Sequence, residues 1–337
     1  MALIEHYGSA ESAWAHLNEP EMSACWERAE EELKWIHAHD IRVWTLSDDD
    51  YPERLRQCPD RPVVLYGKGN IEPTKGHFVS IVGTRRPTER GKELTHRLVR
   101  DLHDRLEQLT IVSGGAYGID IAAHRAAIEY GVPTLIIPAH GLDRIYPYQH
   151  RNDAIASLHN GGLLTEFPSG TEPLPPHFLQ RNRIIAGLAD VVVVVESREK
   201  GGSLVTANMA MDYDRELVTF PGRPDDVSSM GCNNLIRANK AHLIDSADDL
   251  IALMNWSTHT SAAQAIQTTM PGLLGDFSPV QQTLLGKLQE AEDGLNINFL
   301  VMETELPYET VSSELVMLEL EGLVRSLPGG FYRIVRQ

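Results

Sequence analysis

The chain has 337 residues, 42% of them hydrophobic, and a formal net charge of −17, so it can fill the cores of two or three domains. No apolar run approaches the roughly 18 residues of a membrane span, and residues 1–20 lack the basic and apolar regions of a signal peptide. The 3 cysteines are widely spaced and the 14 histidines form no cluster at ligand spacing, which argues against disulfides and a structural metal. We therefore expect a cytoplasmic protein with no membrane segment, metal or other cofactor.

The negative charge is spread unevenly along the chain. Residues 1–76 carry 8 basic and 15 acidic side chains, residues 77–245 carry 18 and 20, and residues 275–337 carry 4 and 10. A strong negative charge argues against a nucleic-acid partner, but the nearly neutral middle segment leaves room for a local positive surface. If the chain binds a polyanion, we expect the binding surface between residues 77 and 245.

Residues 1–60 predict a small helical N-terminal domain, of the SAM or helix-hairpin-helix kind. In ESAWAHL and CWERAEEELKWIHAH, Trp, Leu and Ile recur at roughly helical spacing among glutamates. A stretch rich in Pro and Asp, followed by the short strand VVLY, then leads into the next domain. We place that domain at residues 61–256.

From residue 77 onward the pattern alternates between strands and helices. Strand-like runs occupy residues 78–84, 110–115, 134–140, 162–167, 191–197 and 216–222, and helical runs lie between them. Continuous Val and Ile strands separated by helices predict an α/β fold with a parallel sheet that is covered on both faces. Ligands of such sheets bind outside the carboxyl ends of the strands, so the residues that follow each strand are the candidates for a site.

The C-terminal part predicts a linker and a small domain. Residues 257–278 are small, polar and unpatterned, which is typical of a linker. Residues 279–337 contain two or three helices and then two short strands around a PGG turn, which indicates a winged-helix domain. Its candidate recognition helix, YETVSSELVMLELEG, has four glutamates and no Lys or Arg, so it cannot neutralise phosphates. We interpret the domain as a protein-contact module, against the alternative of a transcription regulator.

The first strand of the alternating segment ends in Gly83, Thr84, Arg85 and Arg86. A glycine at this place lets a ligand approach the backbone, and the free N–H groups of a following helix attract an anion. The spacing fits neither GxGxxG nor a P-loop, so the usual nucleotide fingerprints are absent. An ordinary strand-to-helix turn is the alternative.

Two further turns have the same character. The second strand ends in SGGAYGID, where Ser113, Gly114 and Gly115 precede a helix, and KGGSLVTAN places Gly202 and Ser203 at another helix start. Gly-rich turns at helix starts form phosphate or sugar cradles. Several of them at one edge of a sheet predict a phosphate-bearing or polyanionic ligand.

Catalytic patterns are weaker than binding patterns. Ser113 and Ser203 lack a GxSxG context. Asp120 and Glu196 could form a carboxylate pair for acid–base work, but no metal motif accompanies them. We interpret both as structural or ligand-positioning residues and expect no enzyme. The alternative is a Rossmann protein that binds or hydrolyses a nucleotide derivative.

The stretch HFLQRNRIIAG concentrates an aromatic and two arginines. It follows the proline-rich TEPLPP, so Phe178 stands near the start of a helix, and Arg181, Asn182 and Arg183 follow one turn later. An exposed aromatic beside arginines suits a stacked base and its phosphates. The alternative is that Phe178 is a core residue and that the arginines pair with nearby carboxylates.

Together these motifs resemble the bacterial DNA-processing protein A (DprA/Smf) family. The resemblance rests on IVGTRRPTERG, SGGAYGIDIAAH, GLDRIYP, TEFPSGT, FLQRNRIIAGLAD, VVVVVES, KGGSLVTAN, FPGRP and GCNNLIRANKAHLI, which cover about residues 77–245 in family order. The segment around RPVVLY and the tail ending in PGGFYRIV extend it to nearly the full chain. The resemblance implies an extended Rossmann domain between a small N-terminal helical domain and a C-terminal winged-helix domain.

The resemblance also implies a function. Proteins of this family bind single-stranded DNA without strong sequence preference, protect incoming strands during natural transformation, help to load the recombinase RecA, and act as dimers, here through the Rossmann domain. His177 stands where the family often has a lysine. Carried over by motif, the implied DNA-binding residues are Gly83, Thr84, Arg85, Ser113, Gly114, Gly115, Phe178, Arg181, Asn182 and Lys240. The patterns of the turns and of the arginine stretch add Arg86, Arg183, Gly202 and Ser203.

The hydrolase alternative lacks one motif. Hydrolases of related fold carry a PGGxGT-type loop followed by a glutamate. This chain has KGGSLVTAN, with no glutamate at the matching offset. The sequence therefore favours the DNA-binding reading.

Overall fold

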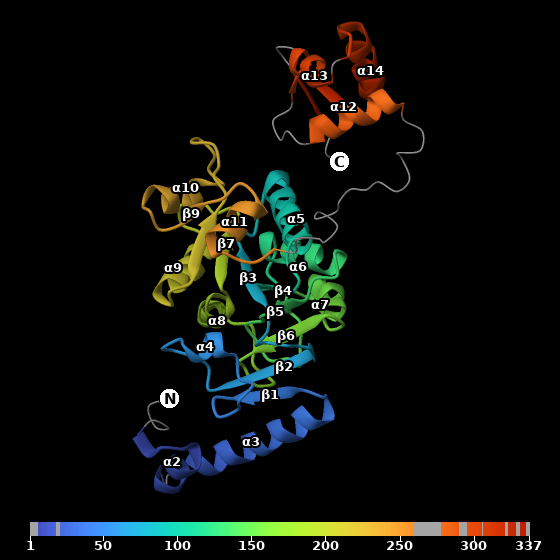
Figure 1. The fold of residues 1–337 in the computed structure, drawn as a ribbon. Helices are drawn as coiled ribbons and strands as arrows, with labels where there is room; N and C mark the ends of the chain where they lie inside the picture. Colours follow the sequence, from blue (N-terminus) through green and yellow to red (C-terminus); the bar gives the residue numbers. More distant parts are fainter. Residues whose placement is uncertain are drawn as a thin grey trace. The chain divides into compact units, whose positions relative to one another are not determined.

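The computed structural model describes residues 6–17, 21–258, 278–289, 295–304, 306–320, 323–327 and 331–334 (Figure 1). The chain divides into two compact units that meet in the sequence near residue 260. Most of the predicted linker, residues 259–277, lies outside the described residues. Within the described ranges, no helix combines the length and the apolar character that a membrane crossing requires.

The first unit is built on a nine-stranded sheet in the order β1-β2-β6-β5-β4-β3-β7-β8-β9. Neighbouring strands from β6 to β9 are parallel, whereas β2 pairs antiparallel with both β1 and β6. The predicted α/β fold with a parallel sheet is confirmed, and an antiparallel pair extends it at one side. The strands are β1 Arg42–Thr45, β2 Val64–Asn70, β3 His77–Val82, β4 Leu109–Ser113, β5 Thr134–Ile136, β6 Gly161–Thr165, β7 Val191–Val194, β8 Glu216–Thr219 and β9 His242–Leu243.

Helices cover both faces of this sheet (Figure 1). Those around the parallel strands are α4 Glu53–Arg56, α5 Glu89–His103, α6 Ile119–Glu129, α7 Arg151–Ser157, α8 Pro175–Leu188, α9 Ser203–Asp212, α10 Met230–Arg237 and α11 Ala247–Met254.

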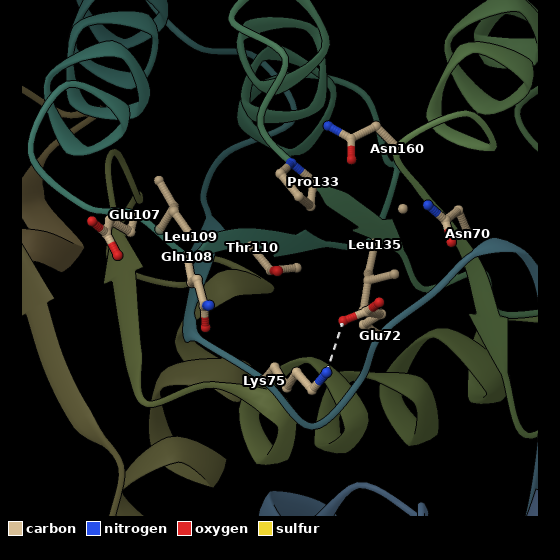
Figure 2. A pocket seen from close by; sticks show the side chains of 11 residues that line it. Asn70, Glu72, Lys75, Glu107, Gln108, Leu109, Thr110, Pro133, Leu135 and Asn160 are labelled. Carbon is tan, nitrogen blue, oxygen red and sulfur yellow. Dashed lines mark ion pairs between the residues drawn. The ribbon is translucent and has the colours of Figure 1, made fainter.

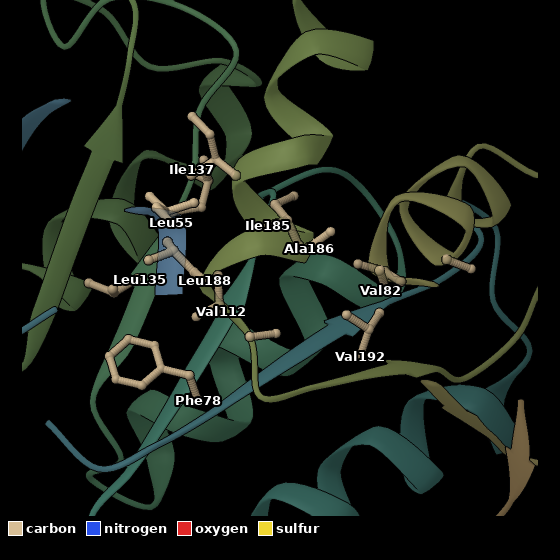
Figure 3. Close-up of a cluster of buried hydrophobic side chains, with 14 of the residues drawn as sticks. Leu55, Phe78, Val82, Val112, Leu135, Ile137, Ile185, Ala186, Leu188 and Val192 are labelled. Carbon is tan, nitrogen blue, oxygen red and sulfur yellow. The ribbon is translucent and has the colours of Figure 1, made fainter. Parts of the chain in front are cut away.

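Side-chain alternation explains the two buried faces. In β3, Phe78 and Val82 belong to one apolar cluster, which includes side chains of α8 and α9 and is drawn in Figure 3. Val79 and Ile81 belong to a second cluster with side chains of α5, α6 and α11. Because the central strands β3, β4 and β7 are buried on both sides, their sequences read as continuous apolar runs.

The predicted helical domain at residues 1–60 differs from the structure. Helices α2 (Ala10–Leu17) and α3 (Glu21–Ala38) lie in this range, but residues 42–45 form β1 and pair with β2. The Trp44 ring is buried and occupies the space beside Gly67, where a Cβ would overlap it. Residues 42–45 therefore belong to the sheet, where the Trp44 ring packs beside Gly67 of β2.

The described residues of the second unit form three helices and a small sheet. The strands lie in the order β10-β12-β11, with β12 antiparallel to both neighbours. Its core includes Leu284, Leu300, Leu315 and Val324, all buried. This arrangement confirms the predicted winged-helix domain. The elements are α12 Pro279–Gln289, β10 Leu295–Asn296, α13 Ile297–Thr304, α14 Tyr308–Leu320, β11 Val324–Leu327 and β12 Phe331–Ile334.

Candidate nucleic-acid interface

The turns that follow β3, β4 and β7 meet at one edge of the sheet, because these strands are parallel neighbours. The Thr84 N–H donates to the Glu196 carbonyl at 2.7 Å, and the Ile119 N–H donates to the Thr84 carbonyl at 3.2 Å. The Ile137 N–H donates to the Ser113 carbonyl at 2.9 Å. We call this side of the sheet the carboxyl edge. The structure thus brings the predicted Gly-rich turns together.

The glycines of these turns make room for the protein itself. We expected Gly83 to let a ligand approach the backbone and Gly114 to form part of a phosphate or sugar cradle. Instead, a Cβ on Gly83 would overlap Ile119, and a Cβ on Gly114 would overlap the guanidinium of Arg181. Gly118 has φ +89° and packs against the Thr84 carbonyl and the backbone of Arg85. These glycines therefore let other parts of the protein pack closely at the carboxyl edge.

Glu196 fixes the start of α5 against the end of β7. Its side chain is buried and accepts from the Thr88 N–H at 2.9 Å and from the Thr88 hydroxyl. Thr88 in turn caps α5, because its Oγ1 accepts from the Gly91 N–H at 3.1 Å. A capping residue satisfies one of the free N–H groups of a helix start. The carboxylate of Glu196 is therefore already occupied by internal hydrogen bonds.

Arg181 and Asp120 lie buried beneath the second turn. Arg181 is 3% exposed and donates to the Ile137 carbonyl, while Asp120 accepts from the Gly114 N–H at 3.2 Å. Burial raises the pKa of the Asp120 carboxyl, against the opposing effects of Arg181 and backbone N–H groups. Burial also lowers the pKa of the Arg181 guanidinium to about 10, which leaves it charged at neutral pH. Arg181 therefore holds the strand ends together and does not face solvent, which corrects its predicted place at the surface.

Arg183 pairs with a carboxylate, as the alternative interpretation of this stretch expected. Its guanidinium contacts Glu166, and the two side chains are 14% and 10% exposed. Burial raises the pKa of Glu166, and Arg183 opposes that rise. Arg183 therefore forms an internal ion pair with Glu166 and is not exposed as a DNA contact would require. Asn182, between the two arginines, is partly buried.

Phe178 lies between an arginine and a tyrosine. The Arg85 guanidinium carbon is 5.7 Å from the centre of the Phe178 ring, within cation–π range. The Tyr146 ring meets the same ring edge to face, with centroids 5.9 Å apart. Phe178 is partly buried, and Arg85 and Arg86 are exposed. The structure thus brings the predicted Arg85 and Phe178 together although 93 residues separate them.

Exposed cations gather at this edge without carboxylate partners. No carboxylate of the described residues lies within ion-pair distance of Arg85, Arg86, Arg198 or Lys200, which follow β3 and β7. Elsewhere, cations such as Arg42, Arg100 and Arg125 do pair with Asp or Glu. Unpaired surface cations are the groups that release counterions from phosphates. The turns after β3 and β7 therefore present cations without ion-pair partners although the chain is acidic.

Four further predicted residues lie at the carboxyl edge, at or after the ends of β4 and β7. Ser113 donates to the Ile81 carbonyl at 2.6 Å and is buried, and Gly115 is buried as well. Gly202 is exposed at the start of α9, while Ser203 is buried and its hydroxyl contacts that of Ser197 at 3.1 Å.

Lys240 lies elsewhere. It precedes β9, a parallel neighbour of β8, and therefore lies at the opposite edge of the sheet, where the parallel strands begin. We call this side the amino edge. Lys240 does not join the carboxyl edge, because the direction of the strand places residues that precede β9 at the other side.

His177 is engaged within the chain. Its ring lies 4.7 Å from the ring of Phe167, and its Nδ1 lies 2.8 Å from the Glu172 carbonyl. The position at which the family often has a lysine is thus filled by a ring packed on a neighbouring loop.

Sequence reasoning missed three exposed tyrosines at the same edge. Tyr117 follows β4, and Tyr146 and Tyr148 lie between β5 and α7. They are 43%, 52% and 75% exposed. The available signal was their position just after strands, in SGGAYGID and GLDRIYPYQH.

A cavity of about 350 Å³ lies at the amino edge (Figure 2). Its lining includes Thr110 and Pro133, near the starts of β4 and β5, and the exposed pair of Glu72 and Lys75 at 3.8 Å. Acidic and basic groups are mixed here, so the cavity lacks a net positive surface. Among the described residues, no group of three or more His, Cys, Asp or Glu is placed to hold a metal ion.

Comparison with known proteins identifies the family. A family model described as DNA recombination-mediator protein A matches residues 42–255, which is more than half of the chain and begins at the first residue of β1. The chain belongs to the DNA recombination-mediator protein A family. A second model, the DprA winged helix domain, matches residues 261–330. The predicted DprA/Smf family is therefore confirmed.

Individual relatives agree with the family models. Protein Smf of a Synechocystis species is 34% identical over 322 residues, which cover 86% of this chain and 79% of that protein. The structure of DNA processing protein A from Streptococcus pneumoniae is 37% identical, with a TM-score of 0.59, and the match covers 63% of this chain and 74% of that one.

A third relative is DNA processing protein A from Helicobacter pylori. Its structure is 32% identical, with a TM-score of 0.57, and the match covers 64% of this chain and 96% of that one. That structure is described as giving insight into the unique single-stranded DNA binding mode of the Helicobacter pylori protein.

Proposed function

We propose that this chain binds single-stranded DNA at the carboxyl edge of its nine-stranded sheet. The observation that carries the proposal is the exposed Arg85 guanidinium, 5.7 Å from the partly buried ring of Phe178 and with no carboxylate of the described residues at ion-pair distance. A cation beside an aromatic ring can hold a phosphate while the ring stacks on the attached base. The binding mode attributed to the Helicobacter pylori relative supports this reading.

The proposed DNA-binding surface contains fewer residues than the sequence predicted. Arg85, Arg86 and Phe178 supply the contacts with DNA, together with the backbone of the turns at Thr84 and Gly202. Arg181 acts from below, because it fills the space beside Gly114 and donates to the Ile137 carbonyl. The contacts read backbone phosphates and ring faces, so we expect little sequence preference.

The cellular role that we propose follows the family. In the cytoplasm the protein protects incoming single strands during natural transformation, helps to load the recombinase RecA, and acts as a homodimer through its Rossmann domain. The winged-helix domain serves as a protein-contact module, since α14 carries Glu309, Glu314 and Glu319 and no Lys or Arg. A helix without cations cannot release counterions from a duplex.

We propose a binding protein rather than an enzyme. The two carboxylates considered for catalysis have other partners, since Glu196 holds Thr88 and Asp120 accepts from the Gly114 backbone beside Arg181. A general base must reach the proton that it abstracts, and both carboxylates are buried in internal hydrogen bonds.

A salt series tests the proposal. Fluorescence anisotropy with labelled single- and double-stranded oligonucleotides should give tighter binding of the single strand. Arg85→Ala should weaken single-strand binding for all sequences and flatten the log–log salt dependence by about 0.7, the share of one phosphate contact on a single strand.

Arg105→Ala is the matched control. Arg105 lies beyond the end of α5 and pairs with Asp248 of α11, so the same change of charge is made away from the carboxyl edge. If the folded Arg85 variant keeps the affinity and the salt slope of the parent protein, Arg85 is not a phosphate contact. If the parent protein binds no single strand, the proposed function is wrong.

A further inference from the structure

Three exposed tyrosines continue the surface of Phe178 along the carboxyl edge. Tyr117 lies in the turn between β4 and α6. Tyr146 lies in the loop after β5, and Tyr148 begins the short 3-10 helix Tyr148–His150 that precedes α7. Their exposed fractions are 43%, 52% and 75%. Large exposed rings at one place mark a binding surface more often than isolated ones do.

Contacts link these rings to the site already described. The Tyr146 ring meets Phe178 at 5.9 Å between centroids, with the planes at 64°. The Tyr117 hydroxyl donates to the side chain of Gln149 at 2.8 Å, which ties the two loops together beside Tyr148.

Tyr117, at the other end of the tyrosine group, is also linked to the site through its neighbours. The ring of Tyr117 packs against His150 at 4.9 Å, and the Nδ1 of His150 lies 2.9 Å from the Gly115 carbonyl. Gly118, the residue after Tyr117, packs against the backbone of Arg85. The tyrosines and Arg85 therefore border one continuous piece of surface.

The chemistry of this surface fits unpaired bases. A tyrosine ring offers a flat apolar face to any base, and stacking on it is tolerant of sequence. Arg85 and Arg86 supply positive charge on the side of Phe178, and the exposed Arg151 at the start of α7 supplies it next to the tyrosine loop. No ion pair of Arg151 occurs within the described residues.

We infer that Tyr146, Tyr148 and Tyr117 form a stacking path that receives the bases next to the one held at Phe178. This inference rests on the proposed single-strand binding at Arg85 and Phe178. It extends the site from one base to a strand that runs over both loops. Bases of a single strand are the occupant, because the path is continuous with unpaired cations and the strand brings phosphates alongside its bases.

The experiment compares two strands that differ in their bases alone. One probe is an oligothymidine of about 16 nucleotides, the upper end of site sizes for small single-strand binding domains. The other is an abasic strand of equal length, which keeps the phosphates and lacks the rings. Affinities are measured by anisotropy for the full-length parent protein and for Tyr148→Ala, Tyr148→Phe and Arg85→Ala.

Each variant has a distinct expected result. Tyr148→Ala should weaken binding of oligothymidine by about fivefold or more, the lower end of the effect of losing one stacked base, and leave the abasic strand within about twofold. Tyr148→Phe should bind as the parent does, because the ring face remains. Arg85→Ala should weaken binding of both strands. Tyr308→Ala, at an exposed tyrosine of the winged-helix domain, is the control and should change neither.

A double variant shows whether Tyr148 has a base of its own. If it has, the fold-losses of Phe178→Ala and Tyr148→Ala should multiply in the double variant, because distant independent contacts are additive in free energy. Equal loss in the double variant and in Phe178→Ala would overturn the stacking path, since Tyr148 would then act through Phe178.

The outcomes separate this inference from the proposed function. A parent protein that binds neither strand contradicts the function itself. A parent protein that binds oligothymidine through Arg85, with Tyr148→Ala unchanged, contradicts the tyrosine path alone. If Tyr148→Ala lost binding to a protein partner but kept the parent's affinity for DNA, the rings would contact a protein. That result would also overturn the stacking path.

Discussion

The two edges of the sheet differ in the property that usually marks a binding site. The amino edge has a cavity of about 350 Å³ with mixed charges. The carboxyl edge has exposed rings and the unpaired cations Arg85 and Arg86, over a floor held by buried Arg181. Concavity favours small ligands, whereas a strand with a phosphate at each nucleotide needs positive charge and flat faces.

The comparison indicates that a cavity alone would not locate the proposed site. Both edges belong to the same strands, yet chain direction sends the Gly-rich turns to one side. The starts of α5, α6 and α9 lie at the carboxyl edge for the same reason, because each of these helices follows a strand that ends there. Substitutions at each edge can therefore test which edge binds DNA.

The largest expected effect concerns the floor of the carboxyl edge. Arg181→Met replaces the guanidinium with an apolar side chain of similar length. Asp120 then stays buried without the positive charge of Arg181. We expect the free energy of unfolding at neutral pH to fall by about 3 kcal/mol, because the Ile137 carbonyl loses its charged donor and the buried Asp120 carboxyl loses the opposite charge of Arg181. Denaturant titration followed by circular dichroism measures it.

The pH dependence of this loss has a definite sign. In the variant, the folded-state pKa of Asp120 is raised above its unfolded value, so the destabilisation should be largest at neutral pH and shrink as the pH falls. The companion Arg181→Met/Asp120→Asn should recover part of the stability. A single variant within about 1 kcal/mol of the parent would show that Arg181 does not hold the strand ends.

The next effect concerns the surface above that floor. Phe178→Ala should weaken single-strand binding by about 5- to 150-fold, the range for one stacked base, and Phe178→Tyr should be nearly neutral. Anisotropy and thermal melting are measured on the same samples. A variant that melts earlier but binds DNA normally would make Phe178 a core residue.

The smallest effect is expected at the amino edge. Lys75→Ala and Lys240→Ala should each change single-strand affinity by less than about twofold. A strand of about five residues spans roughly 16 Å, twice the Debye length of about 8 Å at physiological salt, so these cations are screened from a ligand at the other edge. A loss as large as that of Arg85→Ala would move DNA to the cavity side and reverse the comparison.

Much of the fold could be predicted because its signals are local. Runs such as VVVVV at residues 191–195 need burial on both faces, and that requirement indicates a parallel sheet under helices. Strand β1 was missed because Arg42–Thr45 is short and polar at its ends, and its partner, β2, begins 19 residues further on in the sequence. Pairing between separate segments leaves little trace in either one.

The candidate site could be predicted in place but not in detail. Strand ends located the turns, and the HFLQRNRIIAG stretch located Phe178. The burial of Arg181 depends on Gly114 and Ile137, which are distant in the sequence. One local signal was available, because Arg181 precedes Ile184, Ile185 and Leu188 by three, four and seven residues and so shares their buried face of α8.

Glu196 has a consequence for the thermodynamics of association. Its carbonyl accepts from Thr84 and its side chain from Thr88, so the backbone around Arg85 is preorganised before any ligand arrives. Binding at the proposed site should then cost conformational entropy mainly in long side chains such as Arg85 and Arg86, at about 0.5–1.5 kcal/mol for each one immobilised. Loop ordering adds little, and the protein retains more of its contact energy as affinity.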